Sequence, residues 1–306
     1  MSRRSIALAV LLLAFAAPAG AKTLAVLSTS DAVGKLTPCG CHTPKGGFAR
    51  IASVADSSRA KYGDVLLVEA GDFAPEAANP IEEARIDFQF RIMEQVGYDA
   101  IGVGERELNF GYDKLKALAA ASKVPVVSAN LVDKQTGQLA FKPYAIVKKG
   151  GLKVGVFSVI APKLELPAAA GSELTIGDPL AAAKRTVAEL RKQCDVVVAL
   201  AHVGRVEGED LAAQVKGMDV VILAHHPGFV AQGRRVGSAV TVASGEQIQN
   251  LGVTRLTLDG RKVTDLASET VILVAEVGER ADIARRVKDF EDAQNERLKK
   301  QQLGAR

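Results

Sequence analysis

The chain has 306 residues, of which 48% are apolar and 24% charged, so it is long enough to bury the core of one large soluble domain. Its formal net charge is +4, which falls to about +2 without the two arginines near the N-terminus, and it contains no tryptophan. A nucleic-acid polymer is therefore not expected as a partner, because neither a strongly basic surface nor an aromatic stacking platform is indicated.

The first 21 residues have the pattern of a secretory signal peptide. Arg3 and Arg4 form a basic segment, residues 6–17 a short apolar run, and Ala19-Gly20-Ala21 a small-residue cleavage site. The apolar run is too short to span a bilayer as a stable helix. We therefore expect cleavage after Ala21, a periplasmic or secreted mature protein and no stable membrane anchor; the alternative is an uncleaved anchor.

Apolar, β-branched runs alternate with helical stretches along the rest of the chain. The first half predicts strands over 24–28, 65–69, 100–103 and 124–128, with helices over 48–62, 81–96 and 112–121. The second half predicts a hairpin of strands 144–148 and 153–159, strands over 196–201, 220–223, 240–243 and 253–258, and helices over 179–193 and 208–215. Asp178 is the expected N-cap before Pro179, and Asp259-Gly260 predicts a hairpin turn.

Continuous apolar strands of this kind are typical of sheets that are buried on both faces. We expect one compact α/β domain over residues 22–275, with its strands sandwiched between helices. Residues 276–306 contain a charged helix, predicted over 281–302, that either caps this domain or stays partly free.

Five polar clusters follow predicted strands. They are Ser30-Asp31, Gly71-Asp72, Gly104-Glu105-Arg106-Glu107, Ala201-His202-Val203-Gly204 and Ala224-His225-His226-Pro227. Ligand sites of α/β sheets assemble at strand ends, so these carboxylates and imidazoles should converge at one edge. Divalent cations prefer such donors, and the sequence therefore predicts a metal site. For Asp31 and Asp72 the alternative is helix N-capping.

The order and spacing of these clusters resemble the 5′-nucleotidase branch of the calcineurin-like metallophosphoesterases, which includes the bacterial UDP-sugar hydrolases. The resemblance extends from Leu24 to about Leu258. It rests on Leu27-Ser28-Thr29-Ser30-Asp31, Gly46-Gly47-Phe48-Ala49-Arg50, Val68-Glu69-Ala70-Gly71-Asp72, Gly97-Tyr98-Asp99-Ala100 with Gly104-Glu105-Arg106-Glu107, Ser128-Ala129-Asn130, Leu200-Ala201-His202-Val203-Gly204 and the stretch from Asp219 to Pro227. It implies a four-layer α/β/β/α sandwich in which two divalent ions polarise phosphoryl oxygens and generate a hydroxide nucleophile.

The resemblance also implies roles for individual residues. The implied metal ligands are Asp31, Asp72, Glu105, His202 and His225, with His226 and Cys41 as further candidates, and the ions would be zinc, manganese or iron. Asp72, as the bridging ligand, is the catalytic residue that the resemblance implies, and Arg106 is expected from its own chemistry to clamp a phosphate. Four positions depart from the family pattern: Val33 replaces a histidine ligand, Glu105 an asparagine ligand, Arg106 the catalytic histidine and Pro227 the last histidine ligand. Arginine is always protonated and cannot act as a base or as a conventional acid.

The segment Cys39-Gly40-Cys41-His42 lies in the loop after the first strand. Its thiolate and imidazole donors would favour zinc or copper, whereas its alternatives are a structural disulfide or redox activity of Cys39 and Cys41. The loop also resembles nucleotidase-like proteins in which this site can carry selenocysteine. The chain has three cysteines, and Cys194 is expected either to pack as an apolar residue or to bond one of the other two.

These observations predict an exported metal-dependent phosphoesterase that hydrolyses a nucleotide or another small phosphate ester, with an altered metal site. The alternative is a protein of the same fold that has lost hydrolysis and uses the Cys39-Gly40-Cys41-His42 loop to bind metal or to exchange thiols.

Overall fold

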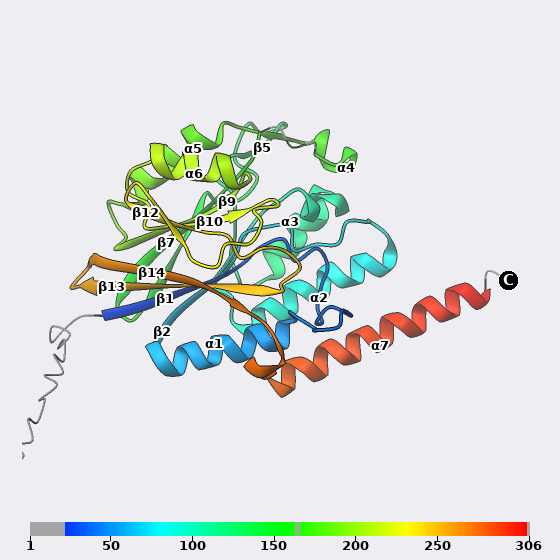
Figure 1. Cartoon of the computed structure of the whole chain (residues 1–306). Helices are drawn as coiled ribbons and strands as arrows, with labels where there is room; N and C mark the ends of the chain where they lie inside the picture. Colours follow the sequence, from blue (N-terminus) through cyan, green and yellow to red (C-terminus); the bar gives the residue numbers. More distant parts are fainter. Residues whose placement is uncertain (1–21, 163, 165, 305–306) are drawn as a thin grey trace, which may run out of the picture.

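Two mixed β-sheets packed face to face form the centre of the molecule (Figure 1). The computed structural model describes residues 22–162, 164 and 166–304; the predicted signal peptide lies outside them. The first sheet has the strand order β14 (Lys262–Ile272), β13 (Asn250–Asp259), β1 (Lys22–Thr29), β2 (Asp64–Glu69), β3 (Ala100–Gly102) and β4 (Val126–Val127). The second has the order β11 (Arg234–Val236), β12 (Ala239–Val242), β10 (Val220–Ala224), β9 (Val196–His202), β7 (Leu152–Ile160) and β6 (Tyr144–Lys149).

Helices cover the outer face of each sheet. On the first sheet these are α1 (Phe48–Tyr62), α2 (Pro80–Val96), α3 (Tyr112–Ala121) and α7 (Ala281–Gly304). On the second sheet they are α5 (Pro179–Leu190) and α6 (Arg205–Gln214), which lie side by side in Figure 1. The predicted four-layer α/β/β/α architecture is confirmed. The short helix α4 (Ala168–Gly171), the 3-10 turns η1 (Arg106–Phe110) and η2 (Ala275–Val277), and the strand pair β5 (Leu131–Asp133) and β8 (Leu174–Ile176) complete the described elements.

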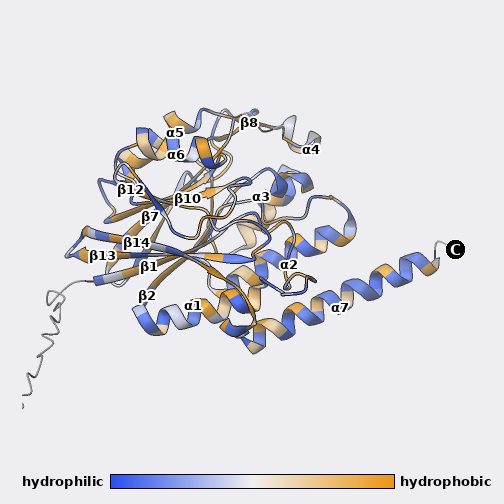
Figure 2. Ribbon diagram, in the orientation of Figure 1, coloured by the Kyte–Doolittle hydropathy of each residue, from blue (hydrophilic) through white to orange (hydrophobic). Residues whose placement is uncertain are grey.

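The alternation of side chains along the strands divides the core into three layers. In β1, Leu24 and Val26 belong to the cluster between the two sheets, whereas Ala25 and Leu27 belong to the cluster under α1 and α2. Both faces of the strand are therefore buried, which explains the unbroken apolar run in its sequence. In Figure 2 the helices α1, α2 and α7 carry both hydrophilic and hydrophobic residues, as expected for helices that cover a sheet with one face.

Helix α7 packs against the body from Ile283 to Gln294. Ile283 and Val287 are buried, and the ring of Phe290 stacks on that of Phe88 with 4.2 Å between centroids. Farther along, Leu298 and Leu303 are exposed, and this end extends beyond the other helices (Figure 1). The helix thus covers α1 and α2 with one part and is free of them at the other.

Most predicted elements form within one or two residues of the expected bounds, but some differ. The helix expected over 208–215 begins at Arg205, and the extended segment expected over 124–128 contains a strand of two residues. The turn at Asp259-Gly260 joins β13 to β14, an edge strand that the sequence did not reveal. No helix within the described residues is long and apolar enough to cross a membrane.

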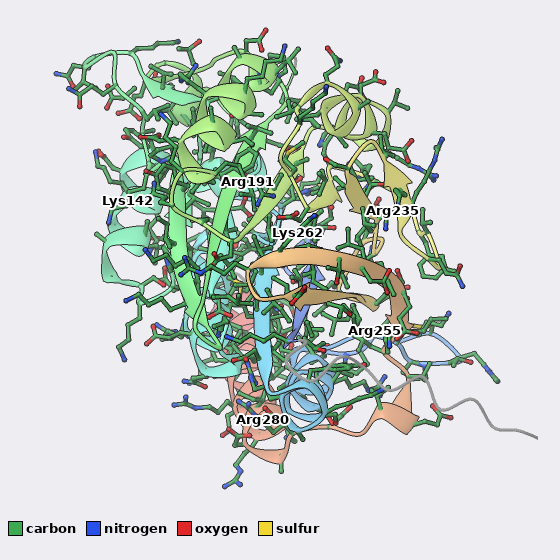
Figure 3. All side chains as sticks on the ribbon, turned by 90° about the vertical axis from the view of Figure 1, so that its left-hand side faces the viewer. Lys142, Arg191, Arg235, Arg255, Lys262 and Arg280 are labelled. Carbon is green, nitrogen blue, oxygen red and sulfur yellow. A yellow bond between two sulfur atoms is a disulfide. The ribbon has the colours of Figure 1, made fainter. Side chains whose placement is uncertain are left out.

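The parallel strands of the two sheets bring their carboxyl ends to one edge of the molecule. Strands β1, β2 and β3 run parallel in the first sheet, and β7, β9 and β10 run parallel in the second. Figure 3 views the end at which β1 and β2 begin, where basic side chains are labelled. Several of these are already paired: Arg191 contacts the Asp219 carboxylate, and Arg280 contacts Asp56 and Asp282. The polar clusters predicted from the sequence therefore occupy the other end.

Candidate metal centre

Four side chains from the two sheets converge at the carboxyl ends of the strands. Asp72 and Glu105 follow β2 and β3, whereas His202 ends β9 and His225 follows β10. Each offers a ligand atom, and these atoms all lie within 4.8 Å of one another. Two carboxylates and two imidazoles suit a divalent ion such as zinc, manganese or iron. The structure thus brings together four of the predicted metal ligands, which we call the four-residue group.

Glu105 connects the two histidines of this group. Its Oε2 lies 2.9 Å from His202 Nε2 and its Oε1 3.1 Å from His225 Nδ1. His202 Nε2 also lies 3.5 Å from Asp72 Oδ1. The two imidazole rings meet edge to face, with centroids 5.3 Å apart. Every distance in the group is therefore compatible with donors that face a common point.

A second contact orients the ring of His202 for binding. Its Nδ1 lies 3.1 Å from the carbonyl oxygen of Ala70, so Nδ1 carries the hydrogen that is donated to that carbonyl. The lone pair of a neutral His202 would then be at Nε2, facing the carboxylates of Glu105 and Asp72. Because this lone pair and the two carboxylates repel one another, a cation or a proton must lie between His202 Nε2 and the carboxylate oxygens. Histidine ligands of metals are commonly held in this way, by donation from the other ring nitrogen to a carbonyl.

Burial and charge set the protonation of the group. Burial raises the pKa of Asp72 well above its ordinary value. Burial alone would lower the pKa of His202, but the carboxylates of Asp72 and Glu105 raise it to about 10. Burial also opposes ionisation of Glu105, yet its hydrogen bonds with His202 and His225 hold its pKa far below the usual range. The group therefore retains a positive charge among its carboxylates, a role that a divalent ion would fill.

The backbone around the group is strained. The described residues other than glycine that have positive φ are Asp31, Val33, Asp72, His225, His226, Gln247 and Ile248, with φ between 49° and 68°. Such conformations cost about 1–3 kcal/mol each and concentrate at functional sites. They lie on the loops after β1, β2 and β10 and on the loop before β13, and the Gln247 amide donates to the Asp31 carbonyl at 2.7 Å. The strained residues thus meet at the edge that carries the four-residue group.

Glu107 holds these loops together. It is fully buried, and its carboxylate accepts hydrogen bonds from the backbone amides of Asp72, Ala74 and Gly104 at 3.1, 2.9 and 2.7 Å. The neighbouring Glu105 faces the histidines instead, because η1 turns the chain between the two residues. The sequence placed both glutamates in one polar cluster and did not distinguish their roles.

Asp31 lies beside the four-residue group but outside it. It is buried, and its Oδ1 accepts hydrogen bonds from the backbone amides of His225 and His226 at 3.1 and 3.2 Å. Its Oδ2 is buried without a hydrogen-bond partner among the described residues. Burial raises the pKa of Asp31. This buried oxygen without a partner is suited to act as an additional ligand of a cation.

His226 pairs with a different carboxylate from its neighbour, although the two imidazole rings lie with their centroids 5.2 Å apart. Its Nδ1 lies 3.0 Å from Glu246 Oε1, in a pair that is largely exposed, and it does not belong to the four-residue group. Glu246 was not predicted as a site residue from the sequence, although it follows the predicted strand 240–243 by three residues. Of the two neighbouring histidines, only His225 therefore belongs to the four-residue group.

Arg106 lies at the rim of the centre. Its backbone amide donates to Asp72 Oδ1 at 3.0 Å, and its guanidinium Nε lies 3.3 Å from Asp72 Oδ2. The side chain is 16% exposed, and Nη1 lies 3.6 Å from the exposed carboxylate of Glu76. One edge of the guanidinium is thus tied to the centre, while the side chain still reaches solvent.

The cysteine loop is not part of this arrangement. Cys39 and Cys41 are joined in a disulfide, and Cys41 and His42 are exposed. In this state Cys41 has no thiolate to offer a metal, and the four-residue group contains no cysteine. Cys194 is unpaired and buried in the core under α5, which agrees with the expectation of a packed apolar residue.

Comparison with known proteins identifies relatives of the chain. It is 33% identical over 205 residues to a 5′-nucleotidase of Vibrio parahaemolyticus, a match that covers 63% of this chain and 36% of the relative. It is 29% identical to a 2′,3′-cyclic-nucleotide 2′-phosphodiesterase/3′-nucleotidase of Yersinia enterocolitica, over 60% of this chain and 32% of the relative. The chain is homologous to the 5′-nucleotidases. The resemblance predicted from the sequence motifs is thereby confirmed, although no protein-family model matches the chain.

Solved structures agree with this relationship at the level of the fold. A 5′-nucleotidase precursor from Thermus thermophilus superposes with a TM-score of 0.79 at 23% identity, over 90% of this chain and 59% of that one. The calcineurin-like phosphoesterase YfkN from Bacillus subtilis gives a TM-score of 0.76 at 22% identity, over 91% of this chain and 99% of that one. The alignments with curated relatives span about a third of those proteins' length.

Proposed function

We propose that this 5′-nucleotidase homologue is an exported, metal-dependent phosphoesterase that hydrolyses a nucleotide or another small phosphate ester. The observation that carries the proposal is the convergence of Asp72, Glu105, His202 and His225 at the carboxyl ends of strands from both sheets. Export is supported by the signal-peptide pattern of residues 1–21.

The four-residue group would hold a divalent ion. Such an ion, when bound, supplies Lewis acidity toward a phosphoryl oxygen and lowers the pKa of water. Asp72 would bridge toward a second ion through its Oδ2, but this oxygen lies 3.3 Å from Arg106 Nε, so the guanidinium would have to give up that contact. The Oδ2 of Asp31 is buried without a hydrogen-bond partner among the described residues. The position of Asp31 supports two ions in total, as the resemblance implies.

The site of the second ion, near Asp31, has fewer ligands than the family pattern provides. Val33 stands where the family pattern has a histidine, and Pro227 replaces the last histidine of the pattern. Neither side chain can bind a metal. We therefore propose an altered centre in which the ion at the four-residue group binds more tightly than the ion near Asp31.

Arg106 would bind the phosphate of the substrate. Its guanidinium is always charged and presents several N–H donors to a planar or tetrahedral anion. It is positioned by its contact with Asp72, so a phosphate bound beside the four-residue group would lie within its reach. Because arginine does not release a proton near neutral pH, Arg106 would not protonate the leaving group.

Hydrolysis of an aryl phosphate tests the proposal. Turnover of p-nitrophenyl phosphate should require added Mn²⁺ or Zn²⁺, stop with a chelator and be lost in Asp72→Asn. Glu246→Gln is the matched control, since this carboxylate lies at the same edge outside the four-residue group, and it should retain turnover. Turnover in Asp72→Asn equal to that of the wild type would refute the assignment.

One observation favours a second candidate function, thiol–disulfide exchange at the cysteine loop. The Cys39–Cys41 disulfide is accessible and links residues only two apart in sequence. Closing so short a loop stabilises a fold by only about 1.6 kcal/mol on the chain-entropy model, against about 3 kcal/mol for a 15-residue loop. The contribution of this disulfide to the stability of the fold is therefore small, which favours a role other than stabilisation.

In the exchange, two small-molecule thiols would each lose one electron and one proton, forming their own disulfide, while Cys39 and Cys41 become thiols. Titration with glutathione redox buffers, read by thiol alkylation and mass spectrometry, measures this directly. A two-electron transition within the glutathione range would support the exchange. A bond that resists reduction throughout that range would rule it out.

A further inference from the structure

A cavity adjoins the four-residue group on the side of the second sheet. Its volume is about 530 Å³, within the range of about 300–1,000 Å³ that is typical of small-molecule sites. Its wall includes Ala161 after β7, Leu180 at the start of α5, Val203 and Leu211 from the β9–α6 segment, and His225. His225 therefore belongs both to the cavity and to the candidate metal centre.

The shared histidine connects the cavity to the reacting position. The His225 side chain is 26% exposed, and its Nδ1 contacts Glu105 within the four-residue group. A phosphate held at this group would thus have the cavity directly beside it. A larger cavity of about 680 Å³ lies toward α2 and α7 and is lined by Val33, Arg85 and Glu291, but it includes no member of the four-residue group.

The chemistry of the wall restricts what can enter. Most lining side chains are aliphatic, and the charged residues among the described lining residues are the carboxylates of Asp178 and Glu207. Asp178 is already engaged, because it accepts a hydrogen bond from the Ala181 amide at 2.7 Å as the cap of α5. The cavity thus offers apolar contact and negative charge, which disfavours a second phosphate group.

We propose that this cavity binds the alcohol portion of the substrate and selects monophosphate esters whose leaving group is apolar and not anionic. Esters that carry further phosphates on the leaving group would be excluded by the carboxylates. The proposal rests on the proposed function, which places the phosphate at the four-residue group. It narrows the substrate class from small phosphate esters in general to this subset.

Binding of phosphonates tests the cavity without requiring turnover. With Mn²⁺-loaded mature protein, calorimetry should show that phenylphosphonate binds about tenfold or more tightly than methylphosphonate, because the ring gains apolar contact. Leu180→Trp fills the cavity and should remove this preference while leaving methylphosphonate binding unchanged. Thr37→Trp, at a residue that lines the larger cavity, is the control and should keep the preference.

A second variant tests whether the negative charge at the cavity disfavours anionic leaving groups. Glu207→Lys should strengthen binding of 4-carboxyphenylphosphonate by about tenfold or more and leave methylphosphonate unaffected. Equal affinities for the phenyl and methyl compounds, or loss of the preference in Thr37→Trp rather than Leu180→Trp, would overturn the proposal while the proposed function stands. Failure of every phosphonate to bind would instead contradict the proposed function and, with it, this inference.

Discussion

Replacing Asp72 by asparagine separates metal binding from folding. The side chain is buried, and its Oδ1 accepts a hydrogen bond from the Arg106 amide that an asparagine carbonyl can also accept. The Oδ2 position makes no hydrogen bond among the described residues, but it lies 3.3 Å from Arg106 Nε, and an asparagine amide nitrogen there loses this ion pair. Burial already disfavours the charge of Asp72 and raises its pKa. We therefore expect the metal-free variant to fold, because the loss of the Arg106 ion pair and the relief of burying the Asp72 charge act in opposite directions on its stability.

In the presence of metal, the thermal stability of the wild type and that of Asp72→Asn should differ. At a Mn²⁺ concentration of 100 times the wild-type Kd, binding adds about 2.7 kcal/mol of stability, which corresponds to about 5–8 °C in Tm for a domain of this size. Loss of a ligand that weakens affinity by about 100-fold leaves a gain of about 0.4 kcal/mol, or about 1 °C. Differential scanning fluorimetry with and without Mn²⁺ measures both values, and Glu246→Gln should keep the wild-type gain. An equal gain in Asp72→Asn would refute the proposed ligand set.

Three further predictions concern residues around the centre. Glu107→Ala leaves three backbone amides without their acceptor and should lower the free energy of unfolding by about 3 kcal/mol or more in guanidinium titrations; a change below about 1 kcal/mol would contradict its role. Arg106→Ala should raise the KM for an aryl phosphate and weaken inhibition by inorganic phosphate about tenfold or more, with metal content unchanged; unaltered phosphate inhibition would exclude the clamp. Burial raises the pKa of Glu69 well above 4.5, so the unfolded chain ionises first and stability falls as pH rises from about 4.5 toward the raised native pKa. Glu69→Gln should accordingly gain stability over the wild type at pH 8 but not at pH 4.5, as measured by urea unfolding of the metal-free proteins; equal differences at both pH values would show that Glu69 is not the cause.

The strong periodic signals of the sequence predicted the layers of the fold. The helix expected over 48–62 forms over those residues, and the apolar strands at 65–69 and 196–201 form with small extensions. Strand β14 was not predicted from the sequence, because it is a half-exposed edge strand with polar residues on both faces. Strands β5 and β8 have three residues each, and their pairing depends on segments about forty residues apart that no local pattern connects.

The candidate site was predictable where a side chain directly follows a buried strand. Asp72, His202 and His225 do so, and strand ends of parallel sheets meet at one edge. The orientation of neighbours was not predictable, since His226 faces Glu246 while His225 faces Glu105. For the cysteine loop the sequence offered a disulfide as one alternative but could not select it, because the loop's conformation depends on contacts of the Cys39 amide and sulfur with Lys45 rather than on a strand end.

Anomalous diffraction from crystals grown with Mn²⁺ tests the central claim most directly. The account predicts a strong anomalous peak enclosed by Asp72, Glu105, His202 and His225, with ligand distances of about 2.0–2.2 Å, and a weaker second peak near Asp31. The peak at the four-residue group should vanish in Asp72→Asn crystals. A map without density among these four side chains, or with its only peak at Cys39, Cys41 and His42, would contradict the account.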